Sequence, residues 1–213
     1  DKTPARPGAP VLEISGLRMR DRHGVERLRG IDLTVRAGEI LGIAGLMGSG
    51  RTELAVSLFG RSYGRDITGH AEIAGRPARL GSVTEAIASG LAYVTEDRKE
   101  LGLILEEPVQ RNISLANLAG ISSSGVLSAG REQAVAERYR RDLRIRTPGV
   151  NQRVMNLSGG NQQKVVLSKW LFTNPEILIL DEPTRGIDVG AKFEIYALMN
   201  ELVAQGRGVV MIS

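Results

Sequence analysis

A run of glycine and hydroxyl residues in the first quarter of the sequence has the composition of a phosphate-binding loop. The run Gly45-Leu46-Met47-Gly48-Ser49-Gly50-Arg51-Thr52 fits the pattern G-x-x-x-x-G-K-[ST], except that arginine replaces lysine. Glycines let successive backbone N–H groups face an anion, and the positive end of a following helix adds to the attraction. The Thr52 hydroxyl is placed to ligate Mg²⁺. We therefore predict phosphate binding; the structural alternative is a tight turn between a strand and a helix.

Two carboxylates follow an apolar run near the end of the sequence. Ile177-Leu178-Ile179-Leu180 predicts a buried strand, and Asp181 and Glu182 come directly after it. Open α/β sheets bind their ligands at the carboxyl ends of their strands. Asp181 would hold Mg²⁺ through water, and Glu182 would polarise a water molecule for attack on a γ-phosphate. Taken alone, the pair could equally be an Asp-Glu-Pro turn.

A second candidate anion site has a hydroxyl and two glycines at the start of a helix. The residues are Leu157, Ser158, Gly159, Gly160, Asn161 and Gln162. Because one chain cannot easily fold two such cradles around the same phosphate, we expect this one to serve a nucleotide held by another domain. The structural alternative is a glycine-assisted helix N-cap.

The periodicity predicts strands that alternate with helices. We expect strands over 11–17, 28–35, 39–44, 91–95, 177–180 and 209–213, and helices over 53–59, 82–89, 112–118, 131–145, 160–172 and 191–204. Residues 96–102 form a charged loop in this interpretation, and residues 39–44 a buried strand. Such alternation predicts an α/β fold with a mainly parallel sheet. Leu167, Trp170, Leu171 and Met199 are expected in the core, and His70 on the surface.

The composition narrows the class of protein. The 213 residues are 42% hydrophobic, enough for one domain with a core of its own. The absence of cysteine excludes disulfides, thiolate zinc sites and cysteine nucleophiles. A net charge of +4, without a block of one sign, argues against a nucleic-acid partner. No apolar run reaches the ~18 residues of a membrane span, and no export signal is recognisable.

With these motifs in this order, the sequence resembles an ATP-binding cassette (ABC) domain from Val11 to Ser213. Four segments narrow the resemblance: GLMGSGRTEL, TEDRKELGL, LSGGNQQKVVLSKWL and LDEPTRGIDVGAK. They are similar to the second, C-terminal cassette of the double-cassette ATPases of bacterial ribose, galactose and xylose importers. The resemblance implies a P-loop α/β fold with an antiparallel N-terminal β part and a helical subdomain at about residues 97–157. Residues 1–10 are expected to be a linker, and the cassette to be truncated at its C-terminal end.

The resemblance also implies a role for each motif. Gly45 to Thr52 corresponds to the Walker A loop, Thr52 and Asp181 to the Mg²⁺ ligands, and Glu182 to the catalytic carboxylate. Residues 157–162 correspond to the signature motif, which contacts the nucleotide of a partner cassette. Glu96 stands at the position of the Q-loop glutamine, and Asp188 lies in the D-loop.

Three features depart from the family pattern. Arg51 replaces the Walker A lysine, and a planar guanidinium does not reproduce a compact ammonium between two phosphates. Glu96 adds negative charge where glutamine is usual. No Phe, Trp or Tyr precedes Phe59, so the usual adenine-stacking aromatic is missing. Arg20, Arg22 or His23 could stack on the base instead, although a solvated arginine turn is the simpler interpretation. We therefore expect a degenerate site in this domain.

The implied function is to couple ATP binding and hydrolysis, with Mg²⁺, to monosaccharide import. The implied partners are an N-terminal cassette of the same polypeptide, integral-membrane permease subunits and, indirectly, an extracytoplasmic sugar-binding protein. The implied location is the cytoplasmic face of the bacterial membrane.

Two alternatives stay open: a cytosolic ABC ATPase that acts on ribosomal RNA, and a regulatory cassette that binds nucleotide without turnover. The lack of an N-K-x-D motif argues against a GTPase, and the short interval between phosphate loop and signature argues against chromosome-maintenance ATPases.

Overall fold

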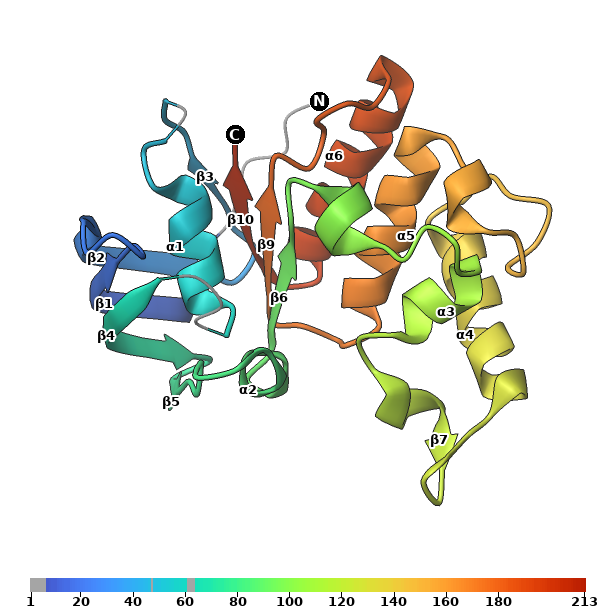
Figure 1. Cartoon of the computed structure of the whole chain (residues 1–213), viewed down its shortest axis with the longest axis horizontal. Coiled ribbons are helices and arrows are strands. Elements are labelled where there is room, and N and C mark those ends of the chain that lie inside the picture. The colour runs from blue at the N-terminus through green and yellow to red at the C-terminus, as the bar shows by residue number, and fades with distance from the viewer. Residues whose placement is uncertain (1–6, 47, 61–63) are drawn as a thin grey trace. The chain divides into compact units, whose positions relative to one another are not determined.

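The computed structural model describes residues 7–46, 48–60 and 64–213, and the chain divides into two compact units (Figure 1). Unit 1 consists of Asp1–Tyr93, Pro175–Glu182 and Met199–Ser213. Unit 2 consists of Val94–Asn174 and Pro183–Leu198. Each unit therefore combines segments that are distant in the sequence.

Unit 1 contains an antiparallel sheet with the strand order β2-β1-β4-β5. Buried residues alternate along β1 at Leu12 and Ile14, and then at Leu17 and Met19, because the pairing register shifts between Ile14 and Leu17. The buried positions therefore change from even to odd residue numbers, while the same face of the strand stays against the core. The strands are β1 (Pro10–Arg20), β2 (Glu26–Arg36), β4 (Arg65–Ile73) and β5 (Arg76–Pro77). The first two confirm the predicted N-terminal strands and extend both of them.

A second sheet has the order β3-β10-β9-β6, and β10 pairs in parallel with both β3 and β9. Its strands are β3 (Ile40–Ile43), β10 (Gly208–Ile212), β9 (Ile177–Asp181) and β6 (Leu91–Val94). The predicted parallel sheet is confirmed. The prediction that residues 39–44 form a buried strand was wrong in its burial, because β3 is an edge strand and its residues are partly or fully exposed. Unit 1 also contains two helices: α1 (Arg51–Leu58), which follows β3, and α2 (Val83–Ala88), which precedes β6.

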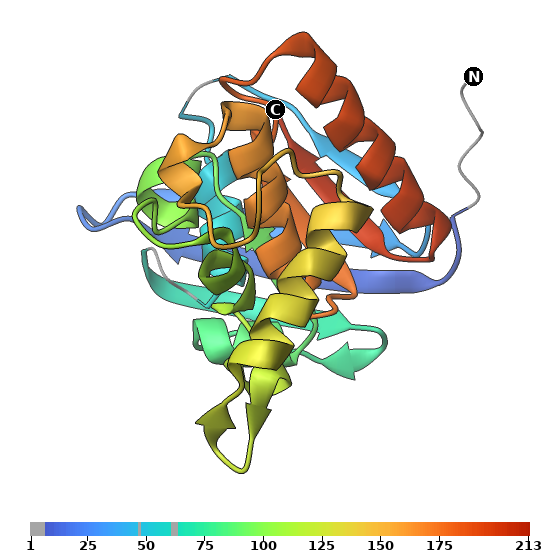
Figure 2. The same cartoon turned by 90° about the vertical axis from the view of Figure 1, so that its right-hand side faces the viewer.

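Unit 2 is mainly helical, and α3 packs against both α4 and α5. Its α-helices are α3 (Val109–Ser114), α4 (Ala129–Asp142) and α5 (Gly159–Leu171). Two short 3₁₀ helices cover Leu118–Ile121 and Val154–Asn156. Between α3 and α4, the strands β7 (Ser122–Ser123) and β8 (Val126–Leu127) form a hairpin that extends beyond the N-terminal end of α4 (Figure 2). The long helix α6 (Val189–Ala204) begins in unit 2 and ends in unit 1.

Other expectations differ in detail. The charged loop predicted over 96–102 contains a π-helix at Arg98–Gly102, because the Asp97 carboxylate accepts hydrogen bonds from the N–H groups of Lys99 and Glu100. Leu167 and Met199 are buried as expected, whereas Trp170 and Leu171 are only partly buried. His70 is exposed, as predicted. Within the described part of the chain, no helix has both the length and the apolar character of a membrane span.

Candidate functional sites

The predicted phosphate loop lies in unit 1, between β3 and α1. Its described residues are exposed up to Ser49, and Met47 lies outside the described residues. Gly48 and Gly50 have φ angles of 80° and 90°, which side chains rarely tolerate. A Cβ on Gly45 would lie 2.8 Å from the Ser49 hydroxyl, which would have to rotate away. The glycines thus have the conformational roles that an open phosphate cradle requires.

Arg51, the first residue of α1, lies against Glu182. The Nη1 atom of Arg51 is 3.8 Å from Oε1 of Glu182, and the arginine side chain is 17% exposed. This Nη1 atom is buried and has no hydrogen-bond acceptor among the residues that the structure describes. A buried guanidinium N–H without an acceptor is costly, and an anion in the loop would satisfy it. The departure from lysine therefore still leaves a cation at the loop.

Glu182 has a strained backbone. Its φ angle is 45°, in the left-handed region that costs a non-glycine residue roughly 1–3 kcal/mol. Its backbone N–H donates to the Ile212 carbonyl at 3.0 Å, which ties the residue to the end of β10. Strain of this kind is concentrated at functional sites, where the surrounding structure imposes it. The backbone therefore supports Glu182 as a functional residue.

Asp181 ends β9 and is completely buried. One of its oxygens, Oδ2, accepts a hydrogen bond from the Tyr93 hydroxyl at 3.1 Å. Asp181 and Thr52 both belong to unit 1 and offer a carboxylate and a hydroxyl, which are hard oxygen donors that suit Mg²⁺. Over residues 7–46, 48–60 and 64–213, no group of three or more His, Cys, Asp or Glu side chains could hold a metal ion. The donor set thus fits a cation that takes further ligands from water or phosphate.

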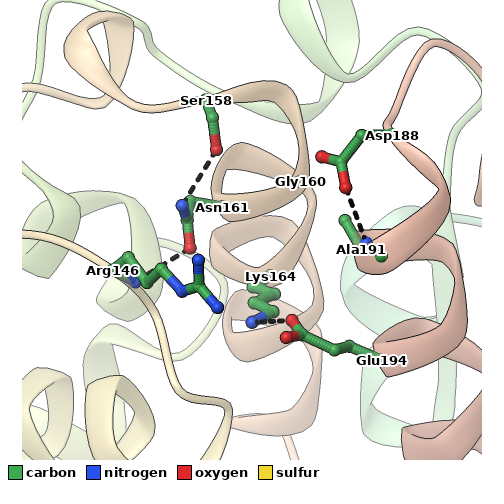
Figure 3. Close-up of a pocket in the computed structure, with 9 residues that line it drawn as sticks. Arg146, Ser158, Gly160, Asn161, Lys164, Asp188, Ala191 and Glu194 are labelled. Carbon is green, nitrogen blue, oxygen red and sulfur yellow. Dashed lines mark hydrogen bonds and ion pairs between the residues drawn. The ribbon is translucent and has the colours of Figure 1, made fainter.

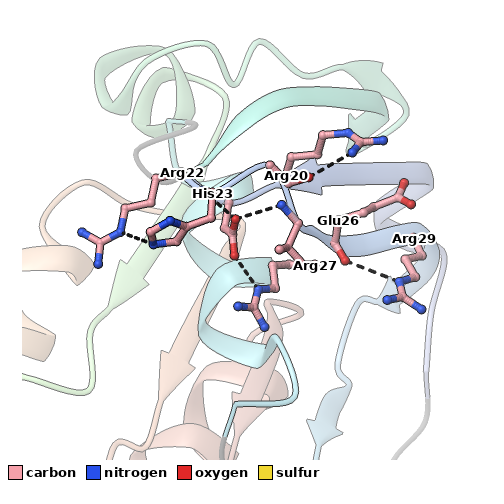
Figure 4. Close-up of polar contacts among 9 residues, drawn as sticks. Arg20, Arg22, His23, Glu26, Arg27 and Arg29 are labelled. Carbon is pink, nitrogen blue, oxygen red and sulfur yellow. Dashed lines mark hydrogen bonds and ion pairs between the residues drawn. The ribbon is translucent and has the colours of Figure 1, made fainter.

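The turn between β1 and β2 carries the arginines that sequence reasoning considered for base stacking. The buried Asp21 carboxylate organises this turn, since it accepts hydrogen bonds from the N–H groups of His23 and Val25 and from Nε of Arg27. Arg22 donates to the His23 ring, and Arg20 to the Gly24 carbonyl (Figure 4). The structure thus favours the interpretation of an ordered arginine turn whose side chains satisfy local acceptors.

This turn lies beside the phosphate loop. The Arg27 carbonyl oxygen is 3.6 Å from the position that a Cβ on Gly50 would take, and the Leu28 side chain is 3.8 Å from it. The start of β2 therefore packs against the residue that precedes α1. A ligand in the loop would have the Asp21-centred turn as its neighbour within unit 1.

The second predicted anion site lies in unit 2 at the start of α5. Ser158 occupies the N-cap position, yet its side chain makes no capping hydrogen bond. Ser158 therefore has the N-cap position that the structural alternative predicts, but not the side-chain hydrogen bond of an ordinary cap. Leu157 is buried just before it, and the buried Gln162 side chain donates to the Val154 carbonyl at 3.2 Å. Of the six predicted residues, Leu157 and Gln162 thus face the interior.

Both glycines of this motif lie in close contact with neighbouring groups, and packing against α6 requires the second of them to be glycine. A Cβ on Gly160 would lie 2.5 Å from the Ala191 Cβ, and a Cβ on Gly159 would lie 2.8 Å from Nη2 of Arg98. The first contact lets α5 approach the start of α6 closely. These glycines therefore have a structural reason in addition to the phosphate contact that the motif predicts.

A cavity of about 150 Å³ opens beside Ser158 (Figure 3). We call it the signature pocket; its polar lining residues are Arg146, Ser158, Asn161, Lys164, Asp188 and Glu194. Lys164 is buried, donates to the Arg144 carbonyl at 3.0 Å and forms an ion pair with Glu194. Asp188 accepts a hydrogen bond from the Ala191 N–H at 2.9 Å and so caps α6. The structure thus brings Asp188 of the predicted D-loop to the same pocket as the signature residues.

Glu96 also lies in unit 2, where its carboxylate pairs with Arg185 at 3.1 Å. Its neighbour Arg98 donates to the carbonyls of Arg185 and Gly186 at 2.9 and 3.3 Å. Sequence reasoning missed both arginine contacts, because the partners are almost 90 positions apart and only the fold brings them together. Arg98 thus joins the segment of Glu96 to the turn that precedes Asp188.

Comparison with known proteins shows which family this sequence matches. Residues 28–185 match the family described as "ABC transporter". The L-arabinose transport ATP-binding protein AraG of Geobacillus stearothermophilus is 57% identical over 86% of this chain and 36% of its own length. The xylose import ATP-binding protein XylG of Thermoanaerobacter pseudethanolicus is 49% identical over 97% of the chain and 41% of its own length. The chain therefore spans about two fifths of the length of these relatives.

Solved structures share the fold. A dimeric ATP-binding cassette bound to ADP and Pi has a TM-score of 0.77 and 20% identity, over 95% of this chain and 87% of that one. A nucleotide-free cassette gives a TM-score of 0.77 at 19% identity, over 96% and 81%. At this identity the similarity establishes only the architecture, which agrees with the predicted P-loop α/β fold. By its sequence match over residues 28–185, this chain belongs to the ABC transporter family.

Proposed function

We propose that this chain is the ATP-binding domain of a bacterial monosaccharide importer and couples ATP binding and hydrolysis to transport through a membrane permease. One observation carries the proposal: a phosphate loop with Asp181 and Glu182 in unit 1 accompanies a separate signature pocket in unit 2. A domain with both needs a second cassette, since its pocket would serve a nucleotide that another loop holds. The relatives named for arabinose and xylose transport support the class of cargo.

In this proposal residues 11–213 form one nucleotide-binding domain, with residues 1–10 as a linker and a helical subdomain at about 97–157. The partner is an N-terminal cassette of the same polypeptide. Permease subunits and an extracytoplasmic sugar-binding protein complete the importer at the cytoplasmic face of the membrane, and no nucleic acid takes part. The sugar itself would be selected by those other components.

The two sites would have unequal roles. Glu182 would orient the attacking water, but its carboxylate faces the Arg51 guanidinium at 3.8 Å. An ion pair there competes with water for the carboxylate, so this domain's own site would bind nucleotide and turn it over slowly. The signature pocket would complete the active site of the partner cassette.

Thr52 and Asp181 would hold Mg²⁺ with the nucleotide. The ion would neutralise charge that develops on the phosphates during transfer. Thr52 would supply its hydroxyl, and Asp181 would act through water while the Tyr93 hydroxyl holds its Oδ2 atom in place. The Nη1–H group of Arg51 would donate a hydrogen bond to the phosphates.

A second candidate function is a regulatory cassette that binds ATP without turnover, and the Arg51–Glu182 pair favours it. Calorimetric titration with MgATP of the wild-type chain and Arg51→Lys separates these two functions, together with an ATPase assay of both proteins. Micromolar binding by the wild type supports a functional cradle. If neither protein binds MgATP, the proposed function is wrong. If both bind and neither hydrolyses ATP, even when joined to its partner cassette, the regulatory function is correct.

A further inference from the structure

The hydroxyl of Ser158 is held by a side chain in the first turn of α5 and does not cap the backbone of that helix. Ser158 is exposed, and its side chain accepts no hydrogen bond from the free N–H groups of α5. Its Oγ atom instead accepts a hydrogen bond from Nδ2 of Asn161 at 2.9 Å (Figure 3). Because capping is the usual reason for serine at this position, the hydroxyl is free for another purpose.

The orientation of the Asn161 amide is fixed from its other end. Its Oδ1 atom accepts a hydrogen bond from the backbone N–H of Arg146 at 2.8 Å. A backbone N–H can only donate, so the amide oxygen must face Arg146 and the amide NH₂ must face Ser158. Arg146 precedes Asn161 by 15 positions, and this contact pins its loop to the first turn of α5.

This arrangement determines what the Ser158 hydroxyl can do. A hydroxyl has one proton and two lone pairs, and Asn161 occupies a lone pair. The proton is therefore left to donate to a ligand. We infer that Asn161 is a positioning residue that makes Ser158 a hydrogen-bond donor to a phosphate oxygen of the nucleotide presented by a second cassette. This inference rests on the proposed function of the signature pocket.

The charges around the pocket suit this role. The Lys164 ammonium is already committed to Glu194 and to the Arg144 carbonyl. Asp188 uses one oxygen to cap α6. Among the described residues, the Arg146 guanidinium has no hydrogen bond or ion pair, so it leaves a positive charge at the pocket. Asn161 keeps the Ser158 hydroxyl in place without adding negative charge near a phosphate.

The sharpest test replaces one atom. Asn161→Asp keeps an oxygen for the Arg146 N–H, but puts a second oxygen where the NH₂ group was. That oxygen can only accept, so the Ser158 proton turns toward it and away from the ligand. In the complete transporter we expect Asn161→Asp to lower kcat for ATP hydrolysis about tenfold or more. Asn161→Ala, which leaves the hydroxyl free to rotate, should have a smaller effect.

A double-mutant cycle separates orientation from charge. If the Asn161→Asp substitution acts by turning the hydroxyl, adding it to Ser158→Ala should change kcat less than about twofold. Asn151→Asp, an equal charge change at an exposed loop position of the same unit, should leave kcat unchanged within the same limit. Thermal unfolding of each variant reports on folding.

The outcomes are distinguishable. If Ser158→Ala hydrolyses ATP like the wild type, the pocket does not bind nucleotide, and both the proposed function of the pocket and this inference fail. If Ser158→Ala is impaired but Asn161→Asp is not, only the inference fails. If Asn161→Asp is equally harmful with and without the Ser158 hydroxyl, its charge acts directly and the inference is again wrong.

Discussion

The Nη1 atom of Arg51 lies 3.8 Å from Oε1 of Glu182, so a cation of the phosphate loop is paired with the carboxylate that follows β9. Both side chains are partly shielded from solvent, with exposures of 17% and 33%. The pair connects two motifs that are 131 positions apart in the sequence (182 − 51). It also supports the proposal that the two nucleotide sites are unequal, because the same carboxylate cannot bind arginine and orient water equally well.

Replacing Arg51 by lysine should therefore release Glu182. The lysine ammonium is more compact than the guanidinium, so it can lie between two phosphates without pairing with the Glu182 carboxylate. We expect Arg51→Lys to raise MgATP hydrolysis at this domain's own site about tenfold, which corresponds to about 1.4 kcal/mol in the barrier. The measurement is phosphate release by a complete transporter whose other catalytic site is inactivated. An unchanged or lower rate would show that the pair does not limit turnover.

Gly160→Ala should destabilise unit 2. The new Cβ would lie 2.5 Å from that of Ala191, and two helix backbones would have to separate. Overpacking of this kind costs roughly 1–3 kcal/mol. Gly130→Ala in α4 is the matched control, because its Cβ would meet nothing within 4 Å and alanine favours a helix by about 0.5–1 kcal/mol. Urea unfolding should show opposite shifts, and equal shifts would contradict the close packing of α5 and α6.

Asp21 should make the stability of unit 1 sensitive to acid. Burial would raise the pKa of this carboxyl, but hydrogen bonds from Arg27, Val25 and His23 outweigh it and lower the pKa below the ordinary value. A carboxyl with a depressed pKa in the folded state stabilises the fold above its unfolded pKa, and this stabilisation is lost as the pH falls. The free energy of unfolding of the wild type should drop from pH 7 to pH 3 more steeply than that of Asp21→Asn. Parallel pH profiles would contradict this role of Asp21.

Lys169 should make the free energy of unfolding depend on pH in the alkaline range. Burial lowers its pKa to about 8, and its ammonium donates to the Gly102 carbonyl at 2.6 Å. Between pH 8 and about 10.4 the unfolded chain binds a proton that the folded chain does not, so stability rises with pH in this window. Relative to Lys169→Met, the wild type should gain about 2 kcal/mol between pH 7 and pH 9.5 in urea unfolding. A constant difference between the two proteins would exclude a lowered pKa.

The sequence indicates which residues could form the sites, but it does not indicate the contacts that hold those residues in place. The predicted phosphate loop and the two carboxylates at the end of β9 are contiguous motifs, so residue type and spacing reveal them. The β4 strand (Arg65–Ile73) was not predicted, because its pairing with β1 is distant in sequence and its mostly exposed pattern lacks an apolar stripe. The π-helix at Arg98–Gly102 was missed because a run of charges resembles a loop.

The contacts that position the site residues could not be found from the sequence. Asn161 binds a backbone N–H of the loop at Arg146, and a backbone group leaves no signal in residue types. Tyr93 reaches Asp181 only because β6 and β9 belong to the same sheet. The pairing of Glu96 with Arg185 likewise depends on the tertiary fold. Motifs thus indicate which groups could react, whereas the fold determines how those groups are oriented.

The central claim is that this domain contributes its signature pocket to a partner's active site more than it contributes its own phosphate loop. Sugar uptake by the complete transporter tests this claim most directly when Ser158→Ala and Arg51→Ala are compared at equal expression. We predict that Ser158→Ala lowers uptake about tenfold or more and that Arg51→Ala lowers it less than about threefold. The opposite ranking would contradict the account.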